Sequence, residues 1–425
     1  MPQNLASCSH THRKTLAAFI WMKILDAPFW AIFNLLPFIV YKDLHATPLQ
    51  ITAMIILKPA VSLVALYWSS LVAERKDRLI SNLVWARVLG NLPFFFFPFV
   101  DNPWFFVASF GFYMMLARGT VPAWMEVLKL NISGVSRERI YAYGSAFGYF
   151  GGAIIPVGLG WVMDIYFQSW RWMFPLAALI SLSAIFLKSR IPIEIGEHKE
   201  AIFSEWGSWK SIKGTMIKQL YKPWKSAWEL LWRKVDFAKF QLAFTIGGAG
   251  LAVMQPALPM FFMDGLHLSY TELGVAIALC KGIGFSFASP WWARLMNKIN
   301  IFRFNGWVYF LAFLFPLCLI IAQINLIWLY AGYLLYGIMQ AGNEMSWSLS
   351  GPVFAKEEDS SIYTSVNILT VGLRGCIVPV FGGLLEYVMA PTGIMIIGSF
   401  LCFLSTICMS SYGRQSKIPE KAIES

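Results

Sequence analysis

The nonapeptide GAIIPVGLG, residues 152–160, recurs 223 positions later as GCIVPVFGG, residues 375–383. The first and last glycines and the central proline of the two copies stay in register at this offset. The same offset carries Lys58 onto Lys281, in two other hydrophobic segments. Matches at a single spacing in separate parts of a chain indicate an internal duplication. We therefore predict that the fold consists of two related halves.

The composition is that of a membrane protein. Of the 425 residues, 57% are hydrophobic and only 13% are charged, whereas soluble domains carry about a quarter charged residues. A helix needs roughly 20 apolar residues to cross about 30 Å of hydrocarbon, and no segment resembles the short alternating strands of a membrane barrel. We predict an all-α membrane protein with twelve transmembrane helices at 16–40, 49–71, 79–100, 104–127, 140–163, 172–192, 238–263, 271–293, 304–323, 326–350, 361–387 and 392–412.

A polar loop divides these spans into two sets of six. The predicted organisation is an N-terminal six-helix half at 1–192, a cytoplasmic linker at 193–237, and a C-terminal six-helix half with a short tail at 238–425. Because each half has an even number of spans, the two repeats enter the membrane from the same side. They are then related by an axis along the membrane normal.

The basic residues set the orientation. Of the 34 lysines and arginines, 26 lie in loops or tails on one predicted side, and only Lys42 and Arg171 lie in loops on the other. The positive-inside rule therefore puts both termini and the linker in the cytoplasm, in the cell (inner) membrane. Topology accounts for most of the net charge of +11, so no nucleic-acid partner is expected.

The sequence gives no sign of a metal, a cofactor or a nucleotide-driven motor. The six cysteines show neither a CxxC pair nor metal-ligand spacing, and His10 and His12 form too short a pattern for a metal site. No GxxxxGK[ST] loop occurs. We expect neither a metal nor a cofactor.

The loop after the second span carries a degenerate form of a known pattern, Gly-x-Leu-x-Asp-Arg-x-Gly-Arg. The matching positions are Ser70, Val72, Glu74, Arg75, Asp77 and Arg78, and a weaker second copy has Ala293, Leu295, Asn297 and Lys298. With the twelve spans and the parallel repeat, the whole chain resembles the major facilitator superfamily of secondary transporters. The resemblance implies two six-helix halves around a central cavity lined by helices 1, 2, 4, 5, 7, 8, 10 and 11.

We predict that this loop and its repeat take part in gating. An acid at a helix end, such as Glu74, can hold a basic loop in one conformation and release it in another. Arg75, and in the second copy Asn297 and Lys298, occupy the corresponding positions. The alternative is that the basic residues serve only to orient the chain in the membrane. The glycines and prolines of the repeated nonapeptide are expected to serve close helix packing.

Six basic residues within the spans are not explained by topology: Lys23, Lys58, Arg87, Arg118, Lys281 and Arg374. Each costs about 2.5–3.5 kcal/mol at a helix centre, so each needs a partner or a watery cavity. By the resemblance, all except Arg87 fall on helices that line the cavity. Arg87 is close enough to a helix end for its stem to reach the inner surface, so we expect a structural role for it.

Lys58, Lys281 and Arg374 should lie near mid-depth, and Asn367 shares a helix face with Arg374. With Arg118, these residues form the predicted substrate site. A site of this charge favours a small anion such as a phosphate ester, a carboxylate or a nucleotide-like compound. The alternative is that the basic side chains form ion pairs with buried acids and hold helices together.

Two acids within the spans are candidates for coupling or for permanent ion pairs. Asp26 lies one turn from Lys23, and Glu344 lies in a polar stripe on the tenth span. A carboxyl that is desolvated in one state and approached by a cation in another can carry a proton. Symport, antiport and uniport all remain open.

The linker contains an aromatic stripe. Trp224, Trp228 and Trp232 recur at helical spacing, with basic residues elsewhere on the same segment. Such a helix is typical of the membrane interface, where indole rings are favoured. A solvated linker with fewer contacts is the alternative.

Taken together, the sequence predicts a secondary active transporter that moves a small anionic organic metabolite by alternating access. It is expected to be a monomer, with its substrate, a proton or counter-substrate, and the bilayer as partners. Proton-coupled efflux of hydrophobic compounds is the first alternative. A membrane-embedded enzyme is a weaker one, because it would need clustered carboxylates, His or Cys at a membrane face, and the sequence shows no such cluster.

Overall fold

The computed structural model describes residues 2–73, 79–120, 124, 127, 152–188, 224–225, 227–296, 298–355 and 360–415. The regular structure of these residues is helical throughout. The first helix group consists of α1 (Pro2–Leu44), α2 (Pro48–Ala73), α3 (Leu79–Asn91) with the 3₁₀ segment η2 (Leu92–Phe99), α4 (Pro103–Gly119), the helix Gly152–Ile165, and α7 (Trp170–Lys188).

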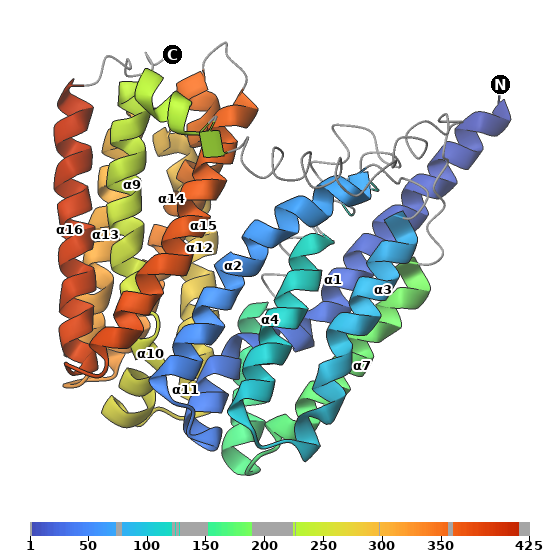
Figure 1. Cartoon of the computed structure of the whole chain (residues 1–425). Helices are drawn as coiled ribbons and strands as arrows, with labels where there is room; N and C mark the ends of the chain where they lie inside the picture. The colour runs from blue at the N-terminus through green and yellow to red at the C-terminus, as the bar shows by residue number, and fades with distance from the viewer. Residues whose placement is uncertain are drawn as a thin grey trace, which may run out of the picture.

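The second helix group begins with a span broken into α9 (Val235–Val253), α10 (Ala257–Met260) and η4 (Phe261–Gly265). The next span is α11 (Tyr270–Gly274), η5 (Val275–Cys280) and α12 (Lys281–Met296) in succession. The group is completed by α13 (Ile301–Ile321), α14 (Ile327–Ala355), α15 (Ser360–Leu385) and α16 (Pro391–Gln415). The two groups lie side by side, and both termini lie at the same end of the molecule (Figure 1).

Each of the twelve predicted spans overlaps a helix wherever its residues are described. Among the described residues, six helices are long and apolar enough to cross a membrane, and a seventh is added if the bent pair 235–253 and 257–265 counts as one span. The predicted fold class, an all-helical membrane protein, is confirmed. The predicted spans 104–127, 140–163 and 172–192 lie partly outside the described residues, and the count of twelve stays a prediction.

Local sequence signals explain where several helices begin. Asn102 accepts a hydrogen bond from the backbone N–H of Trp104 at 3.0 Å and is followed by Pro103, so α4 starts with a capped first turn. Ser269 and Glu272 form a reciprocal capping box at the start of α11. The bend of 41° between α9 and α10 falls at Met254–Pro256, since proline cannot donate the hydrogen bond that would continue the helix.

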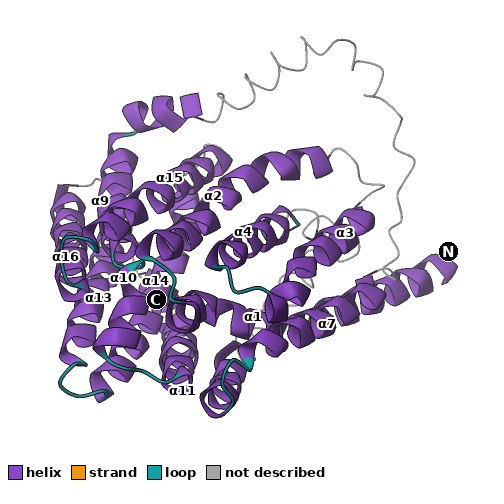
Figure 2. Ribbon diagram, turned by 60° about the horizontal axis from the view of Figure 1, so that its bottom comes forward, coloured by secondary structure: helices purple, strands orange, loops and turns teal. Residues whose placement is uncertain are grey.

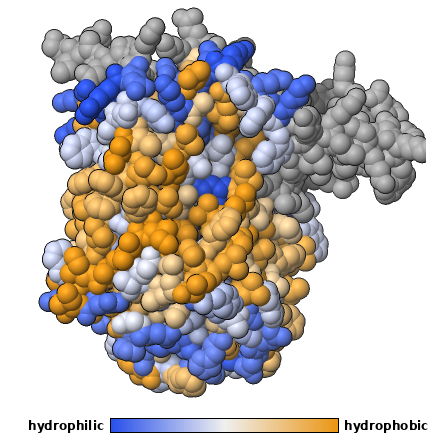
Figure 3. All heavy atoms as spheres, turned by 60° about the vertical axis from the view of Figure 1, so that its left-hand side comes forward, coloured by the Kyte–Doolittle hydropathy of each residue, from blue (hydrophilic) through white to orange (hydrophobic). Residues whose placement is uncertain are grey.

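The outer surface fits a bilayer. Figure 3 shows a band of hydrophobic side chains around the middle of one face, with hydrophilic side chains gathered at the two ends. Large apolar side chains such as Phe287, Phe400 and Leu176 are more than half exposed. An apolar belt of this size would be unstable in water but is solvated by lipid.

Helix contacts of two kinds hold the molecule together. Within the groups, α13 packs on α14 and α16, α12 on α14, α2 on α4, and α1 on α7. Between the groups, α2 packs on α15 and α1 on α10, and α2 and α15 lie next to each other in Figure 2. We call the surface along which the groups meet the seam. The closed end is the end away from the termini, with residues 41–47, 164–171 and 264–272, and the other is the terminal end.

The repeated nonapeptide supplies close contacts across the seam. A Cβ placed on Gly160 would lie 2.5 Å from the backbone oxygen of Tyr270 on α11, and one placed on Gly274 would lie 2.7 Å from the backbone oxygen of Pro156. In the second copy, a Cβ on Gly383 would collide with the Thr52 side chain on α2. Gly160 and Gly383 thus pack between the two groups, whereas Gly382 packs on the backbone oxygen of Val253 within the second group.

Part of the aromatic linker stripe is described. Residues 227–233 are helical, Trp228 and Trp232 are mostly exposed, and the centroids of their rings lie 6.0 Å apart. An exposed indole pair on a helix suits the membrane interface. The interfacial placement of this segment stays a prediction.

The glycine contacts can be tested with two neighbouring substitutions. Gly160→Ala should lower the free energy of unfolding by about 1–3 kcal/mol, because the added methyl group meets backbone atoms that have no room to move. Gly158→Ala is the matched control, since a Cβ there has nothing within 4 Å, and it should be neutral or stabilising by about 0.5–1 kcal/mol. Thermal unfolding of the purified variants in detergent measures the difference, and equal melting temperatures would contradict the packing role.

Candidate substrate site at the seam

Lys58 is an exposed side chain in the middle of a membrane-spanning helix. It lies close enough to Arg118, at the end of α4, and Lys281, at the start of α12, for both to repel its charge. Arg118 belongs to the first helix group and Lys281 to the second. The three basic side chains therefore meet at the seam, and this is the main part of the predicted substrate site that the structure brings together.

Pairs of equivalent residues mark the centre of the seam. Lys58 and Lys281, which are 223 positions apart, interact with each other. The hydroxyl of Tyr41 donates a hydrogen bond to Asp264, which is also 223 positions away. Residues related by a repeat can interact with each other only near the axis that relates the repeats. The lysine pair and the Tyr41–Asp264 pair therefore lie along the central axis.

Lys281 is further positioned by an aromatic side chain of its own group. Its Nζ lies 5.8 Å from the centroid of the Tyr336 ring on α14, within the range of a cation–π interaction. Gly337, the next residue, packs against the backbone carbonyl of Lys281. The close approach of α12 and α14 thus holds this ammonium group beside Tyr336.

Arg374 does not join the three seam bases. Its Nη1 donates a hydrogen bond of 2.8 Å to the carbonyl oxygen of Phe244 on α9, and its guanidinium carbon lies 5.5 Å from the Phe244 ring. The guanidinium also packs directly on Gly248, where any side chain would collide with it. The side chain thus binds α15 to α9 inside the second group, and its predicted depth and contact with substrate stay predictions.

Asn367 is likewise part of the packing of the second group. It is 2% exposed, and its amide donates to the Ser350 hydroxyl on α14 at 2.8 Å and accepts from Gln241 on α9. Thr370 completes the network by donating to Gln241 at 3.1 Å. These hydrogen bonds join three helices of one group. Its predicted contact with substrate stays a prediction that this arrangement does not favour.

Asp26 forms a buried ion pair with Arg87, which the sequence analysis did not anticipate. The Ser181 hydroxyl on α7 donates to the Asp26 carboxylate at 3.1 Å. The expectation that Arg87 reaches the inner surface is wrong, because its guanidinium turns into the first group, where Asp26 supplies the counter-charge. Helical spacing pointed to Lys23 as the partner, but the side chain of Lys23 lies outside those described.

Of the remaining predicted residues, Glu344 and Lys298 are described. Glu344 is exposed on α14, and Lys298 is exposed in the turn before α13. Glu74, Arg75 and Asn297, the other predicted gating residues, lie outside the described residues. Their role therefore stays a prediction.

At the closed end, a set of hydrogen bonds that the sequence analysis missed joins the two groups. The Asp164 carboxylate accepts from the backbone N–H groups of Tyr270 and Thr271, each at 2.8 Å, and so caps α11 from the other group. Asp43 accepts from the Tyr270 hydroxyl at 2.9 Å and from the Trp170 indole at 2.6 Å. The ammonium of Lys42 lies 4.4 Å from the centroid of the Tyr270 ring.

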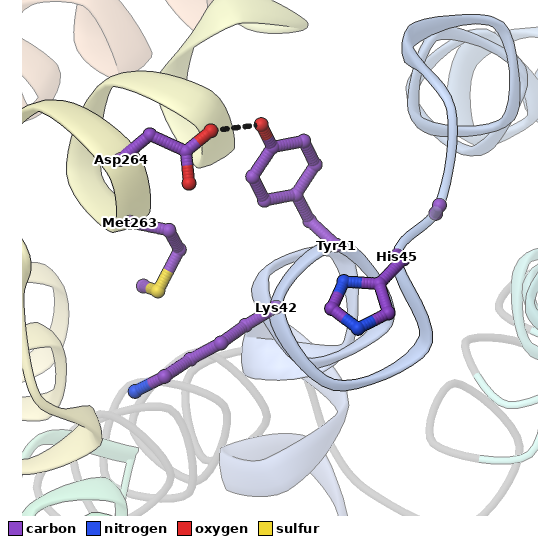
Figure 4. A pocket seen from close by; sticks show the side chains of 6 residues that line it. Tyr41, Lys42, His45, Met263 and Asp264 are labelled. Carbon is purple, nitrogen blue, oxygen red and sulfur yellow. Dashed lines mark hydrogen bonds between the residues drawn. The ribbon is translucent and has the colours of Figure 1, made fainter.

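A cavity of about 310 Å³ lies beside these contacts. It is lined by Tyr41, Lys42, His45, Ala46, Met263 and Asp264. Figure 4 shows Tyr41 and Asp264 pointing toward one another across it, with Lys42 passing below Met263. The only sequence signal for these residues was a cluster of polar side chains in the short loops after α1 and before α11. The closed end is thus polar but tied together across the seam.

The arrangement supplies positive charge and N–H donors but no metal site. Among the described residues, no group of three or more His, Cys, Asp or Glu side chains could hold a metal ion. Lys58 lies within electrostatic range of both Arg118 and Lys281, so the seam carries positive charge that favours an anion. The chemistry available at the seam is therefore binding.

The sequence matches the family model of the Major Facilitator Superfamily over residues 24–379. The chain belongs to this family. It is therefore an integral, multi-pass membrane transporter and not an enzyme. The search of curated protein sequences gave no significant match.

Solved transporter structures share the fold at low sequence identity. A POT family transporter in complex with 5-aminolevulinic acid superposes with a TM-score of 0.71 at 11% identity, over 94% of this chain and 96% of that one. A variant of the nucleoside transporter NupG gives 0.69 at 12% identity, over 94% and 99%. A bacterial homologue of the human lysosomal transporter Spinster, inward-facing and unoccupied, gives 0.58 at 11% identity, over 95% and 96%. At these identities the likeness shows the fold alone.

The Asp26–Arg87 pair makes a testable prediction about stability. Asp26→Asn leaves the Arg87 guanidinium without a counter-charge inside the bundle and should cost about 3–5 kcal/mol in the free energy of unfolding. Replacing both partners, Asp26→Leu with Arg87→Met, should recover most of this loss. Glu344→Gln, which changes an exposed carboxyl, is the control and should change stability by less than about 0.5 kcal/mol. An Asp26→Asn protein as stable as the wild type would show that the pair is not structural.

Proposed function

We propose that this transporter moves a small organic anion by alternating access, with the substrate bound between the two helix groups at Lys58, Arg118 and Lys281. The observation that carries the proposal is the meeting of these three basic side chains at the seam, on the axis of the repeat. Three like charges repel one another strongly where water is scarce. An anion bound among them removes this repulsion.

The location of the bases supports a coupling between binding and movement. Lys58 and Arg118 belong to one group and Lys281 to the other, so an anion that binds all three draws the groups together at mid-depth. A ligand shifts a conformational equilibrium only by binding one state better than the other. The state in which both groups reach the anion is favoured when substrate is present.

The conformation supports access from the terminal end. The contacts at 41–47, 164–171 and 264–272 close the opposite end, while Lys58 is exposed. The excess of Lys and Arg at the terminal end favours the cytoplasm as the medium it faces, in the cell (inner) membrane. We infer an inward-open, monomeric transporter with both termini in the cytoplasm.

The charge of the site supports the substrate class. Two proteins of the same fold are a transporter solved in complex with 5-aminolevulinic acid and a nucleoside transporter. 5-Aminolevulinic acid and nucleosides are both small organic molecules, and the first has a carboxylate. A phosphate ester, a carboxylate or a nucleotide-like compound suits the seam bases of this chain.

The Asp26–Arg87 ion pair reduces the number of candidates for the coupling residue. Asp26 has Arg87 as a buried counter-ion and accepts a hydrogen bond from Ser181, so its contacts support the permanent ion pair rather than the coupling role. Glu344 is exposed on α14 and keeps its place as a coupling candidate. Lys23 on α1 stays a candidate for coupling or for an ion pair.

Uptake into liposomes tests the proposal. Purified protein would be reconstituted and given a panel of labelled phosphate esters, nucleotides, carboxylates and amino acids, together with a hydrophobic cation. We expect uptake of one anionic class. Lys58→Ala and Lys281→Ala should each lower it by about 10–100-fold, because each removes a charge-assisted hydrogen bond worth about 1.5–3 kcal/mol.

Lys225→Ala is the matched control for these substitutions. Lys225 is an exposed lysine that lies 3.8 Å from Glu229 on the surface of the linker helix, and its loss should leave uptake unchanged. If both seam variants carried the anion at the wild-type rate, the anion site would be refuted. Transport of the hydrophobic cation alone would favour the efflux alternative instead.

A further inference from the structure

Glu386 is an acid at the closed end that neither the sequence analysis nor the proposed transport site uses. It directly follows the last residue of α15. The side chain is half-buried, and of its two carboxylate oxygens Oε1 is buried without a hydrogen-bond partner among the described residues. A buried carboxylate without a partner is costly, whereas a protonated carboxyl is much less so. The closed conformation therefore favours the neutral form of this side chain.

Glu386 is placed beside the contact that joins α15 to α2 across the seam. Gly383 makes that contact with the side chain of Thr52, while the neighbouring Gly382 packs on the backbone oxygen of Val253 on α9, within its own group. Glu386 comes three residues after Gly383, about one helical turn further along. The Thr52 hydroxyl oxygen is itself buried without a partner. Two unsatisfied polar groups thus lie on helices of opposite groups, where the closed end must separate to open.

The repeat shows that packing does not require an acid here. The position equivalent to Glu386 in the first half is Met163, 223 residues earlier, and it is 5% exposed. An apolar side chain fills the equivalent place, so the carboxyl of Glu386 is not explained by the shape of the site. Its presence in one half only also breaks the symmetry of the closed end.

The other charged groups of the closed end have partners of their own. Asp264 accepts from Tyr41, Asp43 from Tyr270 and Trp170, and Asp164 from the start of α11. Lys42 lies over the Tyr270 ring, and His45 is exposed at the rim of the cavity. Among the described residues no ion pair reaches Glu386. Glu386 lies close enough to Tyr41 to act on it electrostatically, as Asp264 also does.

We propose that Glu386 is a proton-binding site that controls the closed end: its carboxyl is protonated when this end is shut and ionised when this end is open to the medium. The proposal rests on the proposed alternating access, since it needs the closed end to open. Burial supports it, because desolvation raises the pKa of Glu386 from about 4.5 to about 7 in the shut conformation. An exposed glutamate in the open conformation keeps its ordinary pKa of about 4.3.

The sign of the pH dependence follows from this difference. The carboxyl has the higher pKa in the shut state, so protons stabilise that state. The stabilisation is complete below about pH 4.5 and is lost as the pH rises toward 7. Because the pKa of Glu386 is about 7 in the shut state and about 4.5 otherwise, full protonation changes the ratio of shut to open molecules by up to about 300-fold. Acid on the closed-end side should therefore shut this end.

Distances between two spin labels test the proposal without any substrate. The labels would be placed at Phe167→Cys and Ile324→Cys, two positions that are more than 80% exposed in closed-end turns of opposite groups, in a protein whose six native cysteines are replaced. In the wild-type background the population with the short distance should grow as the pH is lowered from 8 to 5. In Glu386→Gln and Glu386→Met the short distance should dominate at every pH.

Two control variants assign the titration. Asp101→Asn changes a closed-end carboxyl that is paired with Arg171 inside the first group, and His45→Gln changes the nearby imidazole; both should keep the wild-type transition. The proposal would be overturned if the pH-dependent transition persisted in both Glu386 variants or was lost in His45→Gln. It would also be overturned if the distance distribution of the wild type did not change with pH. Because no anion is present, this outcome is independent of the uptake measured for Lys58→Ala.

Discussion

The repulsion among Lys58, Arg118 and Lys281 is the constraint on which the rest of the structure depends. Cations of this kind are stable within a membrane only in water or beside a counter-charge. The structure puts Lys58 and Lys281 together on the axis of the repeat and leaves Lys58 exposed. The two helix groups nevertheless meet beside both lysines, where Gly375 packs against Pro59 and Gly282 against Ala153, and the closed end holds them together.

The closed end does this with short-range contacts. Gly160 and Gly383, the last glycines of the two copies of the nonapeptide, let α11 and α2 approach from the opposite group. Asp164 and Asp43 then add hydrogen bonds across the same surface. Glycine contacts are lost within a small displacement, and hydrogen bonds at a surface can be exchanged for water. The shut conformation of this end is therefore stable, but little free energy is needed to open it, as alternating access requires.

The sequence predicted the helices and one pair of equivalent residues, but not the side-chain contacts between residues far apart in the chain. Hydropathy predicted the helices, and the offset of 223 paired Lys58 with Lys281 because equivalent residues meet at the axis of a repeat. Helical position predicted the depth of Arg374 and Asn367 but not the direction in which they point, and both turn into the second group. The Asp26–Arg87 pair and the capping of α11 by Asp164 join residues far apart in the chain, and no local pattern predicts such contacts.

The most direct test is to ask whether the two equivalent lysines face water or lipid. A spin label at position 58, and separately at position 281, would be exposed to a water-soluble paramagnetic chelate and to oxygen, which concentrates in the hydrocarbon. The account predicts strong relaxation by the chelate at both sites. Strong relaxation by oxygen with none by the chelate would mean that these positions face lipid, and the cationic seam would be refuted.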